Sequence, residues 1–163
     1  MIAAGGNPNA ISRSGWTALY RAGIGFSSEV VRTLLDSGAL PNLPGGCHAL
    51  HAAAAGGWSD VVFALAGGGA DVNSYNEKDD LPLTIALRKK QISKNTILIL
   101  LAYGADVERR NKAGENALEL FATVQDTKIV EMIANAKHGV RPDIKNFMEL
   151  LTCPIWLKSL LNK

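Results

Sequence analysis

A glycine-centred turn motif recurs along the chain, and its spacing constrains the fold more than any other feature. Four clear copies and a weaker fifth occur: Gly5-Gly6-Asn7-Pro8-Asn9, Gly38-Ala39-Leu40-Pro41-Asn42, Gly69-Ala70-Asp71-Val72-Asn73, Gly104-Ala105-Asp106-Val107-Glu108 and Gly139-Val140-Arg141-Pro142-Asp143. The first glycines of successive copies lie 33, 31, 35 and 35 residues apart. Such a period predicts a solenoid, because each unit buries its apolar face only against its neighbours.

A second motif falls between these turns and keeps the same period. Its copies are Gly15-Trp16-Thr17-Ala18-Leu19, Gly46-Cys47-His48-Ala49-Leu50, Asp79-Asp80-Leu81-Pro82-Leu83 and Gly114-Glu115-Asn116-Ala117-Leu118. The four leucines are 31, 33 and 35 residues apart. Two motifs in phase strengthen the prediction of a repeat architecture.

Each repeat is predicted to hold a pair of short helices. The first is rich in small residues, as in 18–22 and 49–55, which lets neighbouring backbones approach closely. The second has apolar residues at i, i+1, i+4 and i+5 and follows a serine, asparagine or aspartate that can cap it; its copies are 29–35, 60–65, 95–101 and 128–133. The next glycine suits a left-handed C-terminal cap, and an extended hairpin leads to the next pair. The fold class predicted is all-α.

These motifs resemble the ankyrin repeat over residues 1–143. Residues 15–23 and 48–53 are similar to the family pattern G-x-T-P-L-H-x-A, and residues 69–73 match its G-A-D-V-N turn. The pattern is incomplete, since its proline occurs only at Pro82 and its histidine only at His51. The third unit is two residues longer between Ala86 and Thr96, and the fourth is degenerate near residues 136–139. The resemblance implies a solenoid of stacked helix pairs with hairpin turns.

The organisation expected is a single ankyrin-repeat domain over residues 1–163. Residues 1–14 form a partial repeat and hairpin; full repeats cover 15–45, 46–78, 79–113 and 114–143; residues 144–163 form a helical C-terminal cap. A short helical docking box is the alternative for 144–163. Met1 and Ile2 align with Leu34 and Leu35, so the array is expected to begin inside an outer helix whose N-terminal end is uncapped and able to contact another molecule.

Composition narrows the class of protein. Hydrophobic residues make up 47% and charged residues 20% of the 163 residues, which excludes a disordered chain, and the apolar runs are too short to cross a bilayer. Two cysteines, Cys47 and Cys153, form no disulfide framework, so both are expected to be free thiols in an intracellular, cytoplasmic protein. If the protein is a bacterial effector, the compartment is the host cytoplasm.

The resemblance implies a non-enzymatic scaffold or adaptor that binds another protein through its concave surface. The chain is expected to be a fragment of a larger signalling, ubiquitin-ligase or bacterial effector protein. The residues expected to contact the partner project from hairpin tips and inner helices: Arg13, Ser14, Trp16, Ile24, Pro44, Cys47, Glu77, Lys78, Asp80, Arg88, Lys89, Lys90, Arg110, Lys112 and Glu115. Trp16 is a candidate energetic anchor, because aromatic residues dominate interface energies, or else packs on a neighbouring residue.

A dense basic cluster runs from Arg88 to Lys94 and continues at Arg109, Arg110 and Lys112. It is either a solvated face or a patch for an acidic partner or an anionic ligand centred on residues 88–90. Nucleic acid is not expected, because no aromatic residues are interleaved with these cations for base stacking and the net charge is only +2.

Cys47, His48 and His51 are all zinc-ligand types, so a metal-binding module centred on Cys47 and His51 is a second alternative. No fourth ligand lies nearby in the sequence, and the resemblance gives His51 a role in fixing a turn. No catalytic nucleophile, base and oxyanion donor are assembled, and no phosphate-binding glycine motif is present. Neither an enzyme nor a cofactor is therefore expected.

Overall fold

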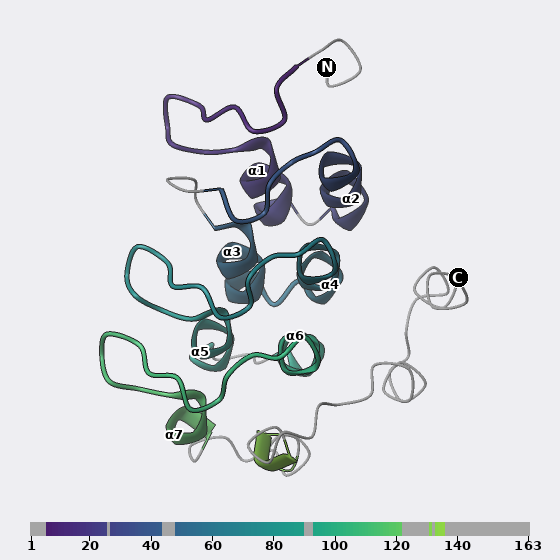
Figure 1. Cartoon of the computed structure of the whole chain (residues 1–163). Coiled ribbons are helices and arrows are strands. Elements are labelled where there is room, and N and C mark those ends of the chain that lie inside the picture. The colour runs from purple at the N-terminus through teal and green to yellow at the C-terminus, as the bar shows by residue number, and fades with distance from the viewer. Residues whose placement is uncertain are drawn as a thin grey trace, which may run out of the picture.

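Helices stack in two layers along the chain. The structure, a computed structural model, describes residues 6–25, 27–43, 48–89, 93–121, 131 and 133–135. Its helices are α1 (Ala18–Ile24), α2 (Ser28–Asp36), α3 (Ala49–Gly56), α4 (Ser59–Gly67), α5 (Pro82–Leu87), α6 (Lys94–Ala102) and α7 (Ala117–Phe121). Figure 1 shows α1, α3, α5 and α7 in one column and α2, α4 and α6 in a second. Regular structure in the described residues is entirely helical, which confirms the predicted all-α solenoid of helix pairs.

The outer helices α2, α4 and α6 begin where the sequence pattern placed them, but their caps differ. The Ser27 hydroxyl accepts a hydrogen bond from the N–H of Val30, and the Ser93 hydroxyl accepts one from Thr96, at 3.3 and 3.4 Å. A polar cap was also expected for α4. That prediction is wrong, because the cap position is Trp58, which makes no side-chain cap bond.

The last residue of the turn motif ties each repeat to the next. The Asn9 side chain donates to the carbonyl of Gly38 and accepts from the N–H of Leu40, at 3.0 and 2.7 Å. Asn42 and Asn73 make the same pair of bonds one repeat further along, at 2.7 to 2.9 Å. In the copies whose first glycine is described, Gly38, Gly69 and Gly104 are left-handed, with φ of 88°, 88° and 89°. The conserved spacing of the motif therefore encodes a ladder of hydrogen bonds between repeats.

The expected hairpins lie between the outer helix of one repeat and the inner helix of the next. A backbone bond and a side-chain bond between the same two residues close three of them. The N–H groups of Ser12, Asn76 and Asn111 donate to the carbonyls of Trp16, Asp80 and Glu115, at 2.9, 3.1 and 2.9 Å. The N–H groups of Trp16, Asp80 and Glu115 donate back to the side-chain oxygens of Ser12, Asn76 and Asn111. Gly15 and Gly114 hold the left-handed position of their hairpins, whereas Asp79 occupies it in the middle one with φ of 55°. Figure 1 shows these hairpins projecting from the inner-helix layer.

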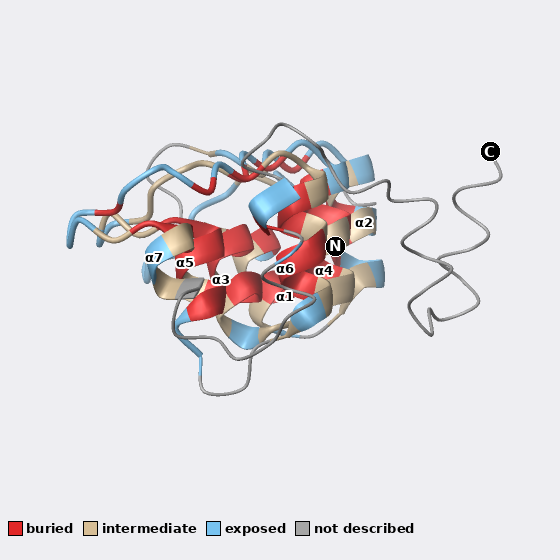
Figure 2. Cartoon of the chain, turned by 90° about the horizontal axis from the view of Figure 1, so that it is seen from below, coloured by how far each residue is buried: buried red, intermediate tan, exposed pale blue. Residues whose placement is uncertain are grey.

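The core fills the space between the two layers, as the buried residues in Figure 2 show. Small residues bring the inner helices together: a Cβ on Gly23 of α1 would lie 3.2 Å from both the Cβ and the carbonyl oxygen of Ala49 of α3. The Trp58 indole packs against Gly56 and the core.

Several predictions lie outside the described residues, among them the start of the array at Met1 and Ile2 and the cap or docking box at 144–163. In the first described helix pair, α2 exposes an apolar side chain whose equivalent is buried in the next pair. Val30 of α2 is 48% exposed, whereas Val61, its equivalent in α4, is 1% exposed. None of the helices that the structure describes has the length and apolar character needed to cross a membrane.

Candidate functional site

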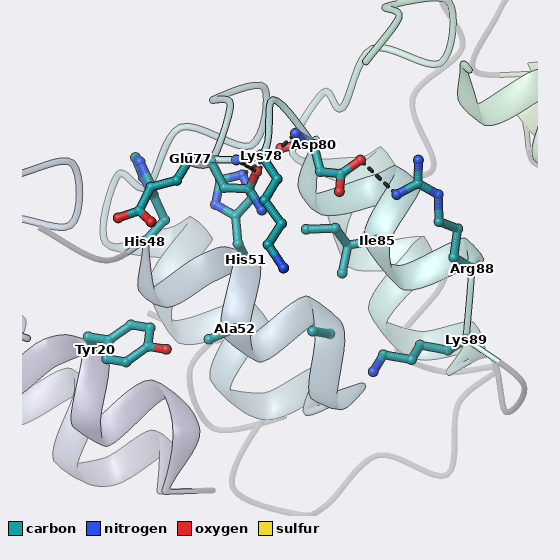
Figure 3. Close-up of a pocket in the computed structure, with 12 residues that line it drawn as sticks. Tyr20, His48, His51, Ala52, Glu77, Lys78, Asp80, Ile85, Arg88 and Lys89 are labelled. Atoms are coloured by element: carbon teal, nitrogen blue, oxygen red, sulfur yellow. Dashed lines mark hydrogen bonds and ion pairs between the residues drawn. The ribbon is translucent and has the colours of Figure 1, made fainter. Parts of the chain in front are cut away.

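Five of the predicted contact residues line a single hollow on the inner-helix layer. Glu77, Lys78 and Asp80 come from the middle hairpin, and Arg88 and Lys89 from the end of α5 (Figure 3). The hollow has a volume of about 530 Å³ and reaches across α1, α3 and α5. His48 and His51, which were named from the sequence as zinc-ligand types, also line it, together with Ala55. The remaining lining residues were not singled out from the sequence: Tyr20, Ala52, Asn76 and Ile85.

The hollow exists because α3 carries small side chains where its neighbours carry large ones. Aligning the repeats by their leucines places Ala52 at the position of Arg21 in α1 and Ile85 in α5. Ala55 falls at the position of Ile24 and Arg88 in the same way. This size pattern was visible in the sequence, but only after the helices were placed side by side.

His51 holds the hairpin over the hollow. Its ring Nε2–H donates to the carbonyl oxygens of Ser74 and Asp80, at 3.0 and 3.1 Å. Burial, together with the neighbouring His48, lowers the pKa of His51 to about 4, so the ring is neutral at pH 7. The tautomer fixed by the two carbonyls leaves Nδ1 as an acceptor, and it has no partner although the residue is only 5% exposed.

The orphaned nitrogen of His51 is explained by comparing the starts of the inner helices. In α1, the Thr17 hydroxyl accepts from the N–H of Tyr20 at 3.0 Å and caps the helix. In α3 the equivalent residue is His48, which makes no cap bond and instead packs its ring edge-on to His51, with centroids 4.9 Å apart. The hydroxyl that caps α1 therefore has no counterpart at α3.

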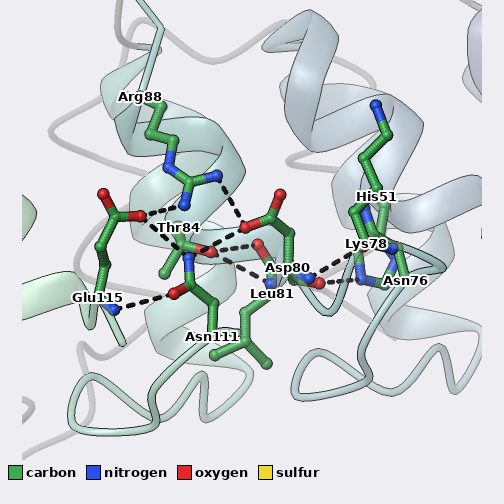
Figure 4. Close-up of polar contacts among 9 residues, drawn as sticks. All are labelled: His51, Asn76, Lys78, Asp80, Leu81, Thr84, Arg88, Asn111 and Glu115. Atoms are coloured by element: carbon green, nitrogen blue, oxygen red, sulfur yellow. Dashed lines mark hydrogen bonds and ion pairs between the residues drawn. The ribbon is translucent and has the colours of Figure 1, made fainter. Parts of the chain in front are cut away.

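Arg88 is held in a polar cluster at one wall of the hollow (Figure 4). Its guanidinium donates to Asp80 at 2.7 Å and also to Glu115, and the Asn111 amide bridges the same two carboxylates at 3.0 and 3.1 Å. Hydrogen bonding to Glu115 raises the pKa of Arg88, and the same bond lowers the pKa of Glu115. Arg88 is thus paired with two carboxylates, which leaves it poorly suited to bind a free anion.

The other predicted cations do not join this hollow. Arg110 pairs with Glu119 at 2.6 Å, and hydrogen bonding to Glu119 raises its pKa. Lys112 pairs with Asp79 at 3.1 Å. Three cations of the basic cluster, Arg88, Arg110 and Lys112, are therefore held in ion pairs, whereas Lys89 is not paired with a described carboxylate.

Trp16 lies beside a second hollow at the first repeat, which Ser14 also lines. It is 36% exposed, with the Arg21 guanidinium 5.1 Å from its ring centroid and the Tyr20 ring 5.6 Å away. Arg13 is exposed on the hairpin of that repeat and Ile24 is half-buried in α1. Trp16 thus packs on residues of α1, and part of its side chain stays exposed to solvent.

Three predicted residues, Pro44, Cys47 and Lys90, lie outside the described part of the chain. The metal-binding alternative at Cys47 and His51 therefore stays a prediction, because Cys47 is one of these three residues. Within the residues that are described, no three histidine, cysteine, aspartate or glutamate side chains gather closely enough to hold a metal ion.

Comparison with known proteins returns a consistent result. A family model described as ankyrin repeats in three copies matches residues 29–111 and again 50–146. A curated B-cell lymphoma 3 protein homolog from Mus musculus is 30% identical over 125 residues, which are 72% of this chain and 28% of that protein. The E3 ubiquitin-protein ligase KEG from Arabidopsis thaliana is 31% identical over 149 residues, 86% of this chain and 9% of that protein. The chain spans less than a third of either relative.

Proposed function

The chain belongs to the ankyrin-repeat family, and from that premise we propose that it is a non-enzymatic scaffold or adaptor that binds another protein through its hairpins and inner helices. Ankyrin repeats are protein-interaction modules, and solenoids of this kind present extended surfaces for recognition. The observation that carries the proposal is the hollow on α1, α3 and α5, where predicted contact residues from one hairpin and one helix meet.

A partner with an acidic surface fits this face best. The ammonium groups of Lys78 and Lys89 line the hollow and make no ion pair with another described residue. Contact through the N-terminal end, where Val30 is exposed, stays a prediction. The name of one relative, an E3 ubiquitin-protein ligase, favours a role inside a larger ubiquitin-ligase protein.

Affinity capture with the full chain tests this function. Immobilised wild-type chain and a Trp16→Ala/Lys78→Glu double variant would be exposed to the same cell extract, and retained proteins identified by mass spectrometry. Both changed residues are exposed on the hairpin side of the molecule, in different repeats. Thr33→Gln, on the opposite face in α2, is the matched control.

We expect a partner that wild type and Thr33→Gln retain and that the double variant loses or binds at least about tenfold more weakly, a difference of about 1.4 kcal/mol. Equal binding of every retained protein to all three chains would contradict the proposed surface. Retention of no protein above bare resin would contradict the proposed function itself.

A further inference from the structure

A trough runs along the exposed face of α3. The hollow on α1, α3 and α5 adjoins another hollow of about 540 Å³ at the C-terminal end of α3, and the two share Ala55 and Lys89. Gly56 and Gly57 line the far end of this adjoining hollow. We call this continuous surface, from His48 past Ala52 and Ala55 to Gly57, the α3 trough.

The walls of the α3 trough are higher than its floor because the neighbouring helices contribute larger side chains than α3 does. On either side of Ala52 and Ala55, α1 contributes Tyr20 and α5 contributes Ile85 and the adjoining Arg88. Methyl groups on the floor let a bound backbone approach closely and offer apolar contact to aliphatic carbons. The α3 helix has 8 residues, which at about 1.5 Å per residue is a length of roughly 12 Å.

Of the cationic side chains at the trough, one is held in ion pairs and two are not paired with a described carboxylate. Arg88 is held by Asp80 and Glu115. Lys78 reaches down from the hairpin and Lys89 extends from the end of α5 toward α3, as Figure 3 shows, and neither is paired with a described carboxylate. Lys78 therefore lies over α3 and Lys89 reaches toward it from the α5 side, while Glu77, the sequence neighbour of Lys78, lies at the His48 end.

We propose, building on the protein-binding function above, that the α3 trough receives a short extended segment of the partner carrying an acidic side chain between Lys78 and Lys89. About four residues of extended chain, at roughly 3.3 Å each, match the length of α3. The carboxylate meets the two ammonium groups, and its aliphatic stem lies on Ala52 and Ala55. A free phosphate could use the cations but not the apolar floor, so a peptide satisfies more of the surface.

Peptide selection on the full chain tests the proposal. A phage-displayed library of random linear peptides would be selected on immobilised wild-type chain, and one enriched peptide synthesised and its dissociation constant measured by fluorescence anisotropy. We expect selected peptides to be enriched in aspartate and glutamate relative to the input library. Binding should weaken at least about tenfold, or about 1.4 kcal/mol, in Ala55→Gln and again in a Lys78→Glu/Lys89→Glu variant.

The variants separate shape from charge. Ala55→Gln fills the trough without adding charge, and α5 already carries the long side chain of Arg88 at the equivalent position, so the fold accommodates it. Thr33→Gln makes the same kind of addition on exposed α2 and should bind the peptide as wild type does. Circular dichroism and thermal unfolding check that each variant is folded.

Other outcomes overturn the inference. Selection without acidic enrichment, selection of no peptide, or equal binding to wild type and Ala55→Gln would each exclude the trough as the docking site. Full competition by inorganic phosphate, with no effect of Ala55→Gln, would point to a simple anion site. A natural partner that tolerates the trough variants but is lost with Trp16→Ala alone would leave protein binding standing and remove only the trough.

Discussion

Replacing His48 with threonine is expected to stabilise the protein, because α3 lacks the hydroxyl that caps α1. A threonine at this position can accept a hydrogen bond from the N–H of His51, as Thr17 does from Tyr20. Its hydroxyl hydrogen can be donated to Nδ1 of His51, which is buried without a partner. Both gains come from one added oxygen.

The magnitude follows from the groups that change. An N-cap hydroxyl contributes about 1 kcal/mol, and satisfying a buried acceptor adds about 1 kcal/mol. The lost edge-on contact between the His48 and His51 rings costs about 0.5 kcal/mol. The net gain is about 1.5 kcal/mol, which for a chain of this size raises Tm by roughly 3–6 °C.

Urea and thermal denaturation at pH 7, followed by circular dichroism, measure this gain. His48→Val is the matched control, because valine has the shape of threonine without the hydroxyl, and it should give none of the stabilisation. If the threonine and valine variants unfold at the same temperature and urea concentration, the missing hydroxyl is not what α3 lacks and the reasoning is refuted.

Three further changes test other parts of the structure. His51 has a folded pKa of about 4 against an ordinary 6.5, so the unfolded chain binds more protons between these values; wild type should lose up to about 3 kcal/mol between pH 6.5 and 4. His51→Gln should lose less over that range in pH-dependent urea titrations, and a parallel loss would contradict the assignment. Asn73→Ala removes two bonds to the next repeat and should lower the free energy of unfolding by about 2 kcal/mol, measured by urea denaturation; an unchanged midpoint would show that the ladder contributes little. Asp79→Gly relieves a left-handed residue and should raise that free energy by about 0.5–1 kcal/mol despite losing the exposed Lys112 pair; a lower Tm by differential scanning calorimetry would mean that the aspartate is preferred there.

Some of the candidate site was accessible from the sequence. The resemblance of the hairpins to the ankyrin pattern pointed to Glu77, Lys78 and Asp80 as projecting residues, and the structure places all three at one hollow. It did not point to His48 or Tyr20, because their role depends on the helix packed beside them. Alignment of the repeats could have indicated the floor of Ala52 and Ala55, because both neighbouring repeats have larger residues at the equivalent positions.

The ion pairs of the charged residues could not be predicted from the sequence. The sequence presents Arg88 in a basic run, while its partner Glu115 lies 27 positions further on. Stacking brings these two side chains together, because residues almost one period apart become neighbours across adjacent repeats. Part of a cluster that is basic along the chain, namely Arg88, Arg110 and Lys112, is therefore paired with carboxylates in space.

The sequence alone determined the repeat, the two helices within it and the left-handed glycine turns, since these depend on local periodicity and on backbone angles that few residues adopt. The tertiary structure decided which charges remain available and where the surface is hollow. Those properties are set by contacts between side chains from different repeats, and their distances are fixed only when the helices pack.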